Sequence, residues 1–288
     1  MLERFGPWLL DRPCPAAVGL PQSLPQQWKG VSARYVGNRA GDGCWSLEAK
    51  KWSPPDWELA VGEELGFSLQ LAPLPSGQVG VFPEQYYNWQ WIRKTLCQHQ
   101  QAGNTESEPA GTHAASRQAR VLNLFAYTGG STLAAAGAGA EVTHVDAAKG
   151  IVTRARANAG LSGMAELPIR WIVEDAVKFC QREVKRGNQY DAVILDPPSY
   201  GHGPRSEAWS IQRDLLPLLR LCGKLTSQRR LFVLASCHTP SIGPAELSAY
   251  LSDGLVGHCG QPPQVGTLQL ETASGRRLSS GVFGRWPG

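Results

Sequence analysis

The stretch VLNLFAYTGGSTLAAAGAGAEVTHVD, residues 121–146, decides the fold expected for this chain. Residues 121–125 form a short apolar run, the pattern of a strand that is buried on both faces. Residues 128–130 are Thr-Gly-Gly, which permits a sharp backbone turn, and the alanine-rich residues 131–138 favour a helix packed closely on a sheet. A second strand follows and ends at Asp146. We therefore predict a strand–turn–helix–strand unit with a carboxylate at its far end.

A carboxylate at this position suits a nucleoside cofactor. Asp146 lies 17 residues beyond Gly129, an offset that places an acid beside ribose hydroxyls. A dinucleotide-binding unit would carry G-x-G-x-x-G at the turn, but NLFAYTGG lacks the first glycines. A cofactor without phosphates fits better, and S-adenosylmethionine is the obvious one. The alternative is an ordinary glycine turn with no ligand.

Composition indicates a globular protein. The chain has 288 residues, of which 42% are hydrophobic and 18% charged, enough for one large domain or two smaller ones. No apolar run reaches the roughly 18 residues of a membrane span, and no signal peptide is expected at the N-terminus. The seven cysteines lack the spacing of a zinc site or a disulfide framework. We therefore expect a cytoplasmic protein without a metal site.

Positive charge gathers in the second half of the chain. Residues 1–118 hold 10 basic and 11 acidic residues, whereas residues 119–288 hold 18 and 13. A basic excess suits contact with a polyanion such as RNA. The candidate phosphate contacts are Arg154, Arg156, Arg182, Arg229 and Arg230.

The pattern of the chain predicts four parts. Residues 1–27, rich in proline and glutamine, are expected to be an extended arm. Residues 28–100 predict a small β-rich domain that ends in a helix, and its many tryptophans either fill its core or offer a stacking surface for bases. Residues 101–118 predict a polar linker. From 119 to 288 strands and helices alternate, which predicts an α/β, Rossmann-like sheet of seven strands with the last two antiparallel.

The stretch GQVGVFPEQYYNWQWIR, residues 77–93, is a second informative segment. It predicts a strand that ends at Phe82 and, after Pro83, a helix over 85–96. Polar groups at the start of this helix could face a ligand.

Acidic residues also follow the later strands. The run Glu-Asp-Ala at 174–176 follows a strand over 169–173, where a carboxylate can accept a hydrogen bond from an adenine amino group. The motif Asp-Pro-Pro at 196–198 follows the next strand, and its two prolines make the loop rigid. The Asp196 carboxylate and the Pro197 carbonyl would then hold an amino group or a base edge in line with a methyl sulfonium. A purely structural turn is the alternative.

These motifs together resemble a known family. NLFAYTGG, HVDAAKG, EDA and DPPSYGHGP are similar to motifs I to IV of class I S-adenosylmethionine-dependent methyltransferases. The resemblance covers residues 28–288 and is greatest to bacterial large-subunit rRNA methyltransferases that make 5-methylcytosine or 7-methylguanine, without the PUA domain that many of them carry. It implies in-line methyl transfer to a base of RNA, most readily rRNA. The alternative is a methyltransferase for a protein or a small molecule, with the N-terminal unit as a lid.

The resemblance also implies roles for individual residues. Asp146 would hold the ribose, Asp175 the adenine, and Asp196 would face the methyl group and its acceptor. The expected cofactor-binding residues are Phe82, Gln85, Phe125, Tyr127, Thr128, Gly129, Asp146, Ala147, Glu174, Asp175, Ala176 and Asp196. The expected catalytic residues are Asp196, Pro197, Tyr200, which could stack on the base, and Cys237.

Cys237 has two interpretations. In 5-methylcytosine enzymes a cysteine after this strand adds to carbon-6 of the pyrimidine, and His238 could assist it here. A cysteine at a strand end is more often a small buried packing residue, which is the interpretation we favour.

Overall fold

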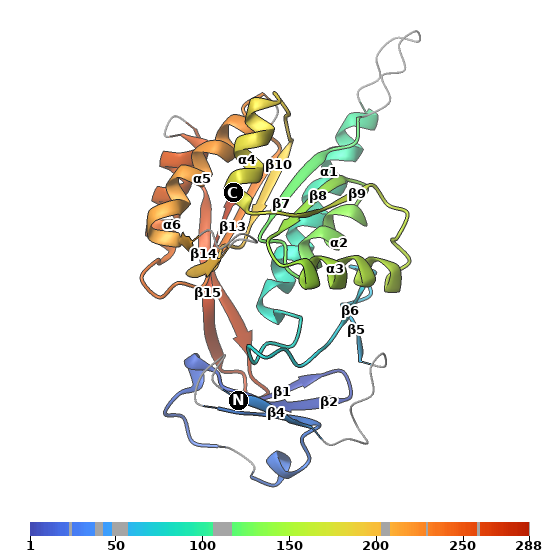
Figure 1. Cartoon of the computed structure of the whole chain (residues 1–288), viewed down its shortest axis with the longest axis vertical. Coiled ribbons are helices and arrows are strands. Elements are labelled where there is room, and N and C mark those ends of the chain that lie inside the picture. Colours follow the sequence, from blue (N-terminus) through green and yellow to red (C-terminus); the bar gives the residue numbers. More distant parts are fainter. Residues whose placement is uncertain are drawn as a thin grey trace.

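The computed structural model describes residues 1–22, 25–37, 43–47, 57–105, 117–202, 208–228, 230–257 and 260–287. A seven-stranded sheet lies between two layers of helices, and a smaller β unit lies beyond one end of it (Figure 1). No helix in these ranges has both the length and the apolar character needed to cross a membrane.

The seven-stranded sheet has the order β14-β15-β13-β10-β7-β8-β9. Its strands are β7 (Arg120–Leu124), β8 (Glu141–Asp146), β9 (Ile169–Val173), β10 (Ala192–Leu195), β13 (Phe232–Cys237), β14 (Gln264–Glu271) and β15 (Arg277–Trp286). Strand β15 runs antiparallel to β13 and β14, and the other neighbours are parallel. The expected Rossmann-like sheet with two antiparallel final strands is confirmed.

The helices cover the sheet on both faces. The first core contains residues of α1 (Tyr86–Thr105), α2 (Gly130–Ala136) and α3 (Lys149–Leu161), and the second contains residues of α4 (Ala176–Lys185), α5 (Ile211–Leu225) and α6 (Pro244–Leu251). Val121 of β7 belongs to the first core, and its neighbour Leu122 to the second. This alternation explains why the central strands are apolar throughout.

The N-terminal residues form part of a sheet. Strands β1 (Leu2–Phe5), β2 (Trp8–Asp11), β3 (Ala33–Val36) and β4 (Cys44–Leu47) make a four-stranded sheet in that order. The extended arm expected for residues 1–27 is therefore wrong for residues 2–11. Gly6, at a φ of 55°, allows the tight turn between β1 and β2, and Phe5 and Leu10 are buried. The two strands are too short to stand out beside the proline-rich residues that follow them.

The segment before α1 also differs from expectation. Strands β5 (Glu58–Ala60) and β6 (Ser68–Gln70) form a hairpin, but residues 77–82 are not a strand. Their backbone pairs with 72–74, through hydrogen bonds from Ala72 N to Val79 O (2.9 Å) and from Leu74 N to Gln78 O (2.8 Å). A 3₁₀ turn, Pro83–Gln85, then leads into α1.

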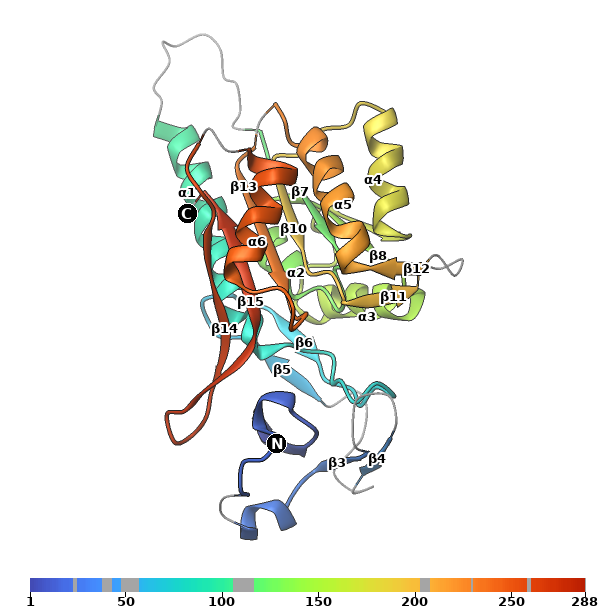
Figure 2. The same cartoon turned by 90° about the vertical axis from the view of Figure 1, so that its left-hand side faces the viewer.

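Helix α1 belongs to the layer on the large sheet. It begins where expected but runs to Thr105, well past residue 96. Ile92 and Leu96 are buried in the first core, and the Trp91 ring lies 5.3 Å from that of Phe232 on β13. The linker expected at 101–118 falls largely outside the described residues, so the division into domains stays a prediction. Figure 2 shows the β14–β15 hairpin reaching beyond the sheet towards the N-terminal β unit.

Candidate active site

The expected site residues follow the carboxyl ends of the parallel strands. These ends meet at one edge of the sheet, and β7 lies between β8 and β10, where the chain order reverses. Open α/β sheets bind ligands at this point. The edge is therefore the first place to look for a cofactor.

The turn after β7 is bent around Asp146. Its Oδ2 accepts a hydrogen bond from Tyr127 N (2.9 Å), and its Oδ1 accepts one from Ala148 N (3.0 Å). Phe125 and Tyr127 have φ values of 54° and 49°, which are uncommon for aromatic residues. Burial raises the pKa of Asp146, while the backbone N–H groups, including that of Ala147, act in the opposite direction.

Further contacts fix the rest of this turn. The Thr128 hydroxyl donates to Gly80 O (2.6 Å), and Asn158 donates to Thr128 O (2.9 Å). Gly129, at a φ of 94°, begins α2 in a conformation that favours glycine. The Tyr127 ring lies 5.1 Å from that of Phe82, and burial raises the pKa of Tyr127 to about 12. Thr128 and Phe82 thus hold the turn against the N-terminal half of the chain.

A cavity of about 40 Å³ lies between this turn and the ends of β10 and β13. Its lining includes Phe82, Gln85, Asn123, Phe125, Tyr127, Thr128, Gly129, Asp196 and Ser236. It is large enough for a few atoms and too small for a nucleoside. Polar side chains and aromatic rings therefore line this cavity together, and the cofactor-binding roles expected for Asp146 and Asp175, which lie outside its lining, stay predictions.

The acids after β9 have different partners. Asp175 caps α4 by accepting a hydrogen bond from Lys178 N (2.9 Å), ahead of the buried Ala176. Glu174 pairs with Arg182 at 2.5 Å between Oε2 and Nη2. This pairing makes Arg182 a poor phosphate contact. Of the other expected phosphate contacts, Arg230 lies 5.7 Å from the Trp286 ring, whereas Arg229 lies outside the described residues.

Asp196 is the centre of a hydrogen-bonded cluster. Its Oδ1 accepts from Ser236 Oγ (2.7 Å) and lies 3.3 Å from His238 Nε2, and its Oδ2 accepts from Gln85 Nε2 (3.1 Å). The same Gln85 nitrogen donates to Ser236 Oγ (3.0 Å), while Gln85 Oε1 accepts from Asn88 (2.6 Å). Gln85, which was expected to contact the cofactor, therefore donates a hydrogen bond to Asp196. Ser236 is not among the site residues expected from the sequence, and His238 was expected only as a partner of Cys237.

The loop after Asp196 is fixed on both sides. Pro197 is buried, and Pro198 O accepts from Trp209 Nε1 (2.7 Å). Tyr200 begins β11 (Tyr200–His202), which pairs with β12 (Ala208–Ser210), and its side chain is 74% exposed. An exposed ring on a fixed loop beside Asp196 is free to stack on a planar group.

Cys237 faces away from this cluster. Successive side chains of a strand point to opposite faces, so Ser236 meets Asp196 and Cys237 enters the second core with Leu247 and Val282. Cys237 is 1% exposed, and burial raises the pKa of its thiol. These surroundings disfavour the thiolate that a nucleophile requires.

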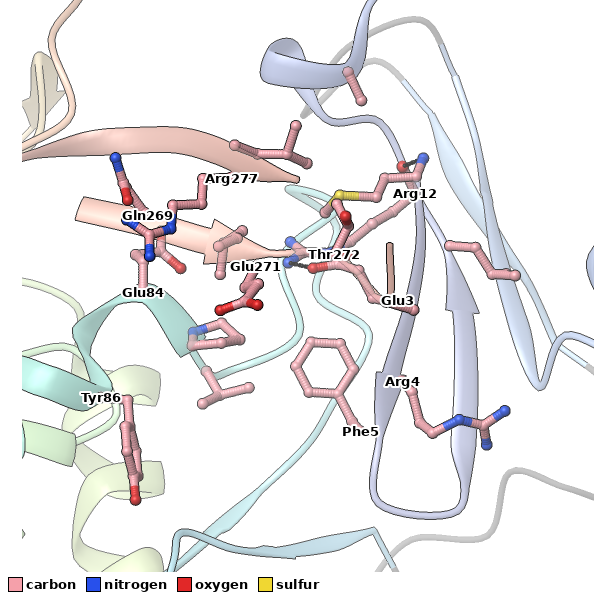
Figure 3. A pocket seen from close by; sticks show the side chains of 18 of the residues that line it. Glu3, Arg4, Phe5, Arg12, Glu84, Tyr86, Gln269, Glu271, Thr272 and Arg277 are labelled. Carbon is pink, nitrogen blue, oxygen red and sulfur yellow. Dashed lines mark hydrogen bonds and ion pairs between the residues drawn. The ribbon is translucent and has the colours of Figure 1, made fainter. Parts of the chain in front are cut away.

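A second cavity, an open groove of about 1880 Å³, lies between the N-terminal sheet, the start of α1 and the β14–β15 hairpin (Figure 3). Val81 and Trp89 line both this groove and the small cavity, so the two are neighbours. Its lining includes Arg4, Arg276 and Arg277, which are exposed and pair with no carboxylate in the part of the chain that the structure describes.

Three of the four carboxylates in this groove already have partners. Glu3 pairs with Arg12, Asp11 with Arg34, and the buried Glu84 accepts from Ser280 Oγ (2.8 Å). The fourth, Glu271, stands opposite Arg277 in the β14–β15 ladder. Among the described residues that line the groove, the charged side chains without a partner are therefore mainly positive.

A family model for S-adenosylmethionine-dependent methyltransferases matches residues 92–253. The chain belongs to this family. A crystal structure of the SAM-dependent methyltransferase from Agrobacterium tumefaciens is similar over 99% of this chain and 86% of that one, with 32% identity and a TM-score of 0.84. A putative methyltransferase crystallised with SAH shares the fold, with 20% identity and a TM-score of 0.63 over 90% of this chain and 63% of that one.

Shorter similarity exists to curated rRNA enzymes. Ribosomal RNA large subunit methyltransferase K/L of Pseudoalteromonas atlantica is 40% identical over 102 residues, 35% of this chain. That of Methylococcus capsulatus is 38% identical over 106 residues, 36% of this chain. Each match covers 14% of the relative, so this chain matches only about a seventh of the length of either rRNA enzyme.

We predict that Asp146→Ala weakens binding of S-adenosylmethionine by about 1–3 kcal/mol, because a half-buried acceptor for ribose hydroxyls is lost. Titration calorimetry measures the change. The control is Glu141→Ala at the other end of β8, which pairs with Arg120 at 3.7 Å and should leave affinity unchanged. Equal affinities in a folded Asp146→Ala protein would exclude Asp146 as a cofactor ligand.

Proposed function

We propose that this chain transfers a methyl group from S-adenosylmethionine to a base of RNA, with rRNA as the first candidate. The groove beside the Asp196 cluster carries this proposal. Its volume of about 1880 Å³ exceeds the roughly 300–1,000 Å³ of a small-molecule pocket, which favours a polymer. Arginines without carboxylate partners among the described residues suit a phosphate backbone.

The Asp196 loop would hold the acceptor base. Oδ1 of Asp196 already faces two donors and Oδ2 only one, so Oδ2 can accept a further hydrogen bond from the edge of a base. Tyr200 would stack on the base from the same loop. When bound, the cofactor supplies an electrophilic methyl group. The chain's own contribution is to position the acceptor in line and to exclude water.

The named relatives add modest support. The K/L enzymes are named for the large ribosomal subunit, but their similarity to this chain covers only 14% of their length. A protein or small-molecule substrate, with the N-terminal β unit as a lid, is the competing possibility. Location in the cytoplasm stays a prediction from the sequence.

The test is methyl transfer from tritiated S-adenosylmethionine to large-subunit rRNA from cells that lack the gene. We expect transfer by the wild type and a loss of turnover of at least about a hundredfold in Asp196→Asn, with little change in cofactor affinity. Mass spectrometry of the RNA identifies the methylated nucleotide. Transfer to cell protein or to small molecules, and none to rRNA, would favour the competing possibility.

Cys237 provides a second test in the same assay. Because its thiol is buried in the second core, we expect Cys237→Ala to lose no more than a few-fold in turnover. Carbon-5 of cytosine needs a thiolate addition at carbon-6, whereas a nitrogen acceptor has its own lone pair. RNA that contains 5-fluorocytosine should therefore trap no covalent adduct. An adduct mapped to Cys237 would show 5-methylcytosine chemistry and a movement of β13.

RNA binding should depend on the groove. We expect replacement of Arg276 and Arg277 by alanine to weaken binding of an rRNA fragment and to lower the salt slope of log K by about two, roughly one per lost phosphate contact. The same double replacement at Arg220 and Lys224 on α5 is the control, because both side chains lie on a helix that does not line the groove. Fluorescence anisotropy at several salt concentrations measures both. Equal slopes in the two double variants would exclude the groove as the RNA path.

A further inference from the structure

We infer that His238 is a positioning residue of the methyl-transfer site, a doubly protonated imidazole that clamps the Asp196 carboxylate to β15. The inference rests on the proposed function and adds a residue to its site. His238 follows β13, and the clamp connects the acceptor side of the site with the wall of the groove.

Both ring nitrogens of His238 face acceptors. Nδ1 lies 2.6 Å from Ser280 O, a backbone carbonyl, which can only accept a hydrogen bond. Nε2 lies 3.3 Å from Asp196 Oδ1, which also accepts from Ser236 Oγ. A neutral imidazole donates from one nitrogen only, so satisfying both contacts with an ionised Asp196 requires an imidazolium.

The far side of the clamp reaches the groove. Ser280, whose carbonyl holds His238, donates its hydroxyl to Glu84 Oε1 (2.8 Å). Glu84 lines the groove and directly precedes Gln85, which donates a hydrogen bond to Asp196 Oδ2. Two chains of contacts therefore lead from this groove wall to one carboxylate.

The backbone of β15 leaves space for the imidazole. Gly281 has a φ of 122°, and a Cβ at this position would lie 2.8 Å from His238 Nδ1. The same Cβ would lie 2.7 Å from the backbone oxygen of Cys237, so a larger residue would disturb the close approach of β15 to the end of β13. Strand β15 can therefore approach the His238 ring closely enough for Ser280 O to contact it.

The electrostatic surroundings agree with the geometry. Burial alone would lower the pKa of His238, but the hydrogen bond and charge of Asp196, with the charge of Glu84 and the Ser280 carbonyl, raise it to about 9. The charged groups that face the ring are Asp196 after β10 and Glu84 before α1. Cys237, its neighbour on β13, points into the second core.

The clamp has a consequence for the reaction. The contacts of Oδ1 with Ser236 and His238 oppose rotation of the carboxylate and leave Oδ2 to face a substrate. Because the pKa of His238 is raised to about 9, the imidazolium persists at neutral pH, and the clamp is lost as the pH rises through about 9.

The activity test compares His238→Ala, His238→Gln and the control His99→Gln on the exposed surface of α1, in the rRNA assay above. We expect turnover to fall about ten- to hundredfold in the alanine variant, as for loss of a hydrogen bond to a charged group, with cofactor affinity and KM for RNA changed less than about twofold. Glutamine, which can donate one N–H to Asp196, should restore part of the turnover. The wild-type rate should decline above pH 9, and the glutamine variant should lack this decline.

Proton NMR titration tests the clamp without a substrate. The His238 signal, assigned by its loss in His238→Gln, should titrate near pH 9 and move towards 6.5 in Asp196→Asn. An ordinary midpoint in the wild type, or unchanged turnover in His238→Ala, would overturn the inference. If the wild type transfers no methyl group to rRNA, the proposed function fails, and the positioning role fails with it even if the titration shows the clamp.

Discussion

A carboxylate partly removed from water at the end of a buried strand needs hydrogen-bond donors, and the site is organised around this requirement at Asp196. Its donors come from two other segments, Gln85 before α1 and Ser236 with His238 at the end of β13. Gln85 is 111 residues away along the chain. The hydrogen bonding of Asp196 is therefore complete only when the N-terminal half of the chain packs against the sheet.

Helix α1 provides that packing. Ile92 and Leu96 are buried against the sheet, while Asn88 and the backbone of Tyr87 accept hydrogen bonds from Arg285 on β15. These contacts fix the register of the helix and so the position of Gln85, which directly precedes it. The family match begins at residue 92. Part of the candidate site thus lies in a segment outside the matched range.

Local patterns were enough to predict the sheet and the acids at its edge. Apolar runs, the glycine turn and the prolines after Asp196 act over a few residues, and the strands they predicted agree closely with β7 to β10. The Asp196 cluster could not be predicted in the same way, because its partners meet only through the strand order. The face of the sheet to which the Cys237 side chain points could not be predicted for the same reason. Strand alternation places Ser236 and Cys237 on opposite faces, but the register with β10 and β15 decides which residue meets Asp196.

The strand order also separates the two tasks of the site. Strand β7 lies between β8, which ends at Asp146, and β10, which leads to Asp196. Two strand spacings amount to about 10 Å, so neither carboxylate can do the work of the other. In-line transfer needs the acceptor on the far side of the methyl group from its leaving group. Under the proposed function, Asp146 serves the nucleoside and Asp196, held from β13 and the turn before α1, serves the acceptor, so the strand order meets this requirement. Under the same proposal, the contacts at Oδ1 leave Oδ2 of Asp196 to face the acceptor.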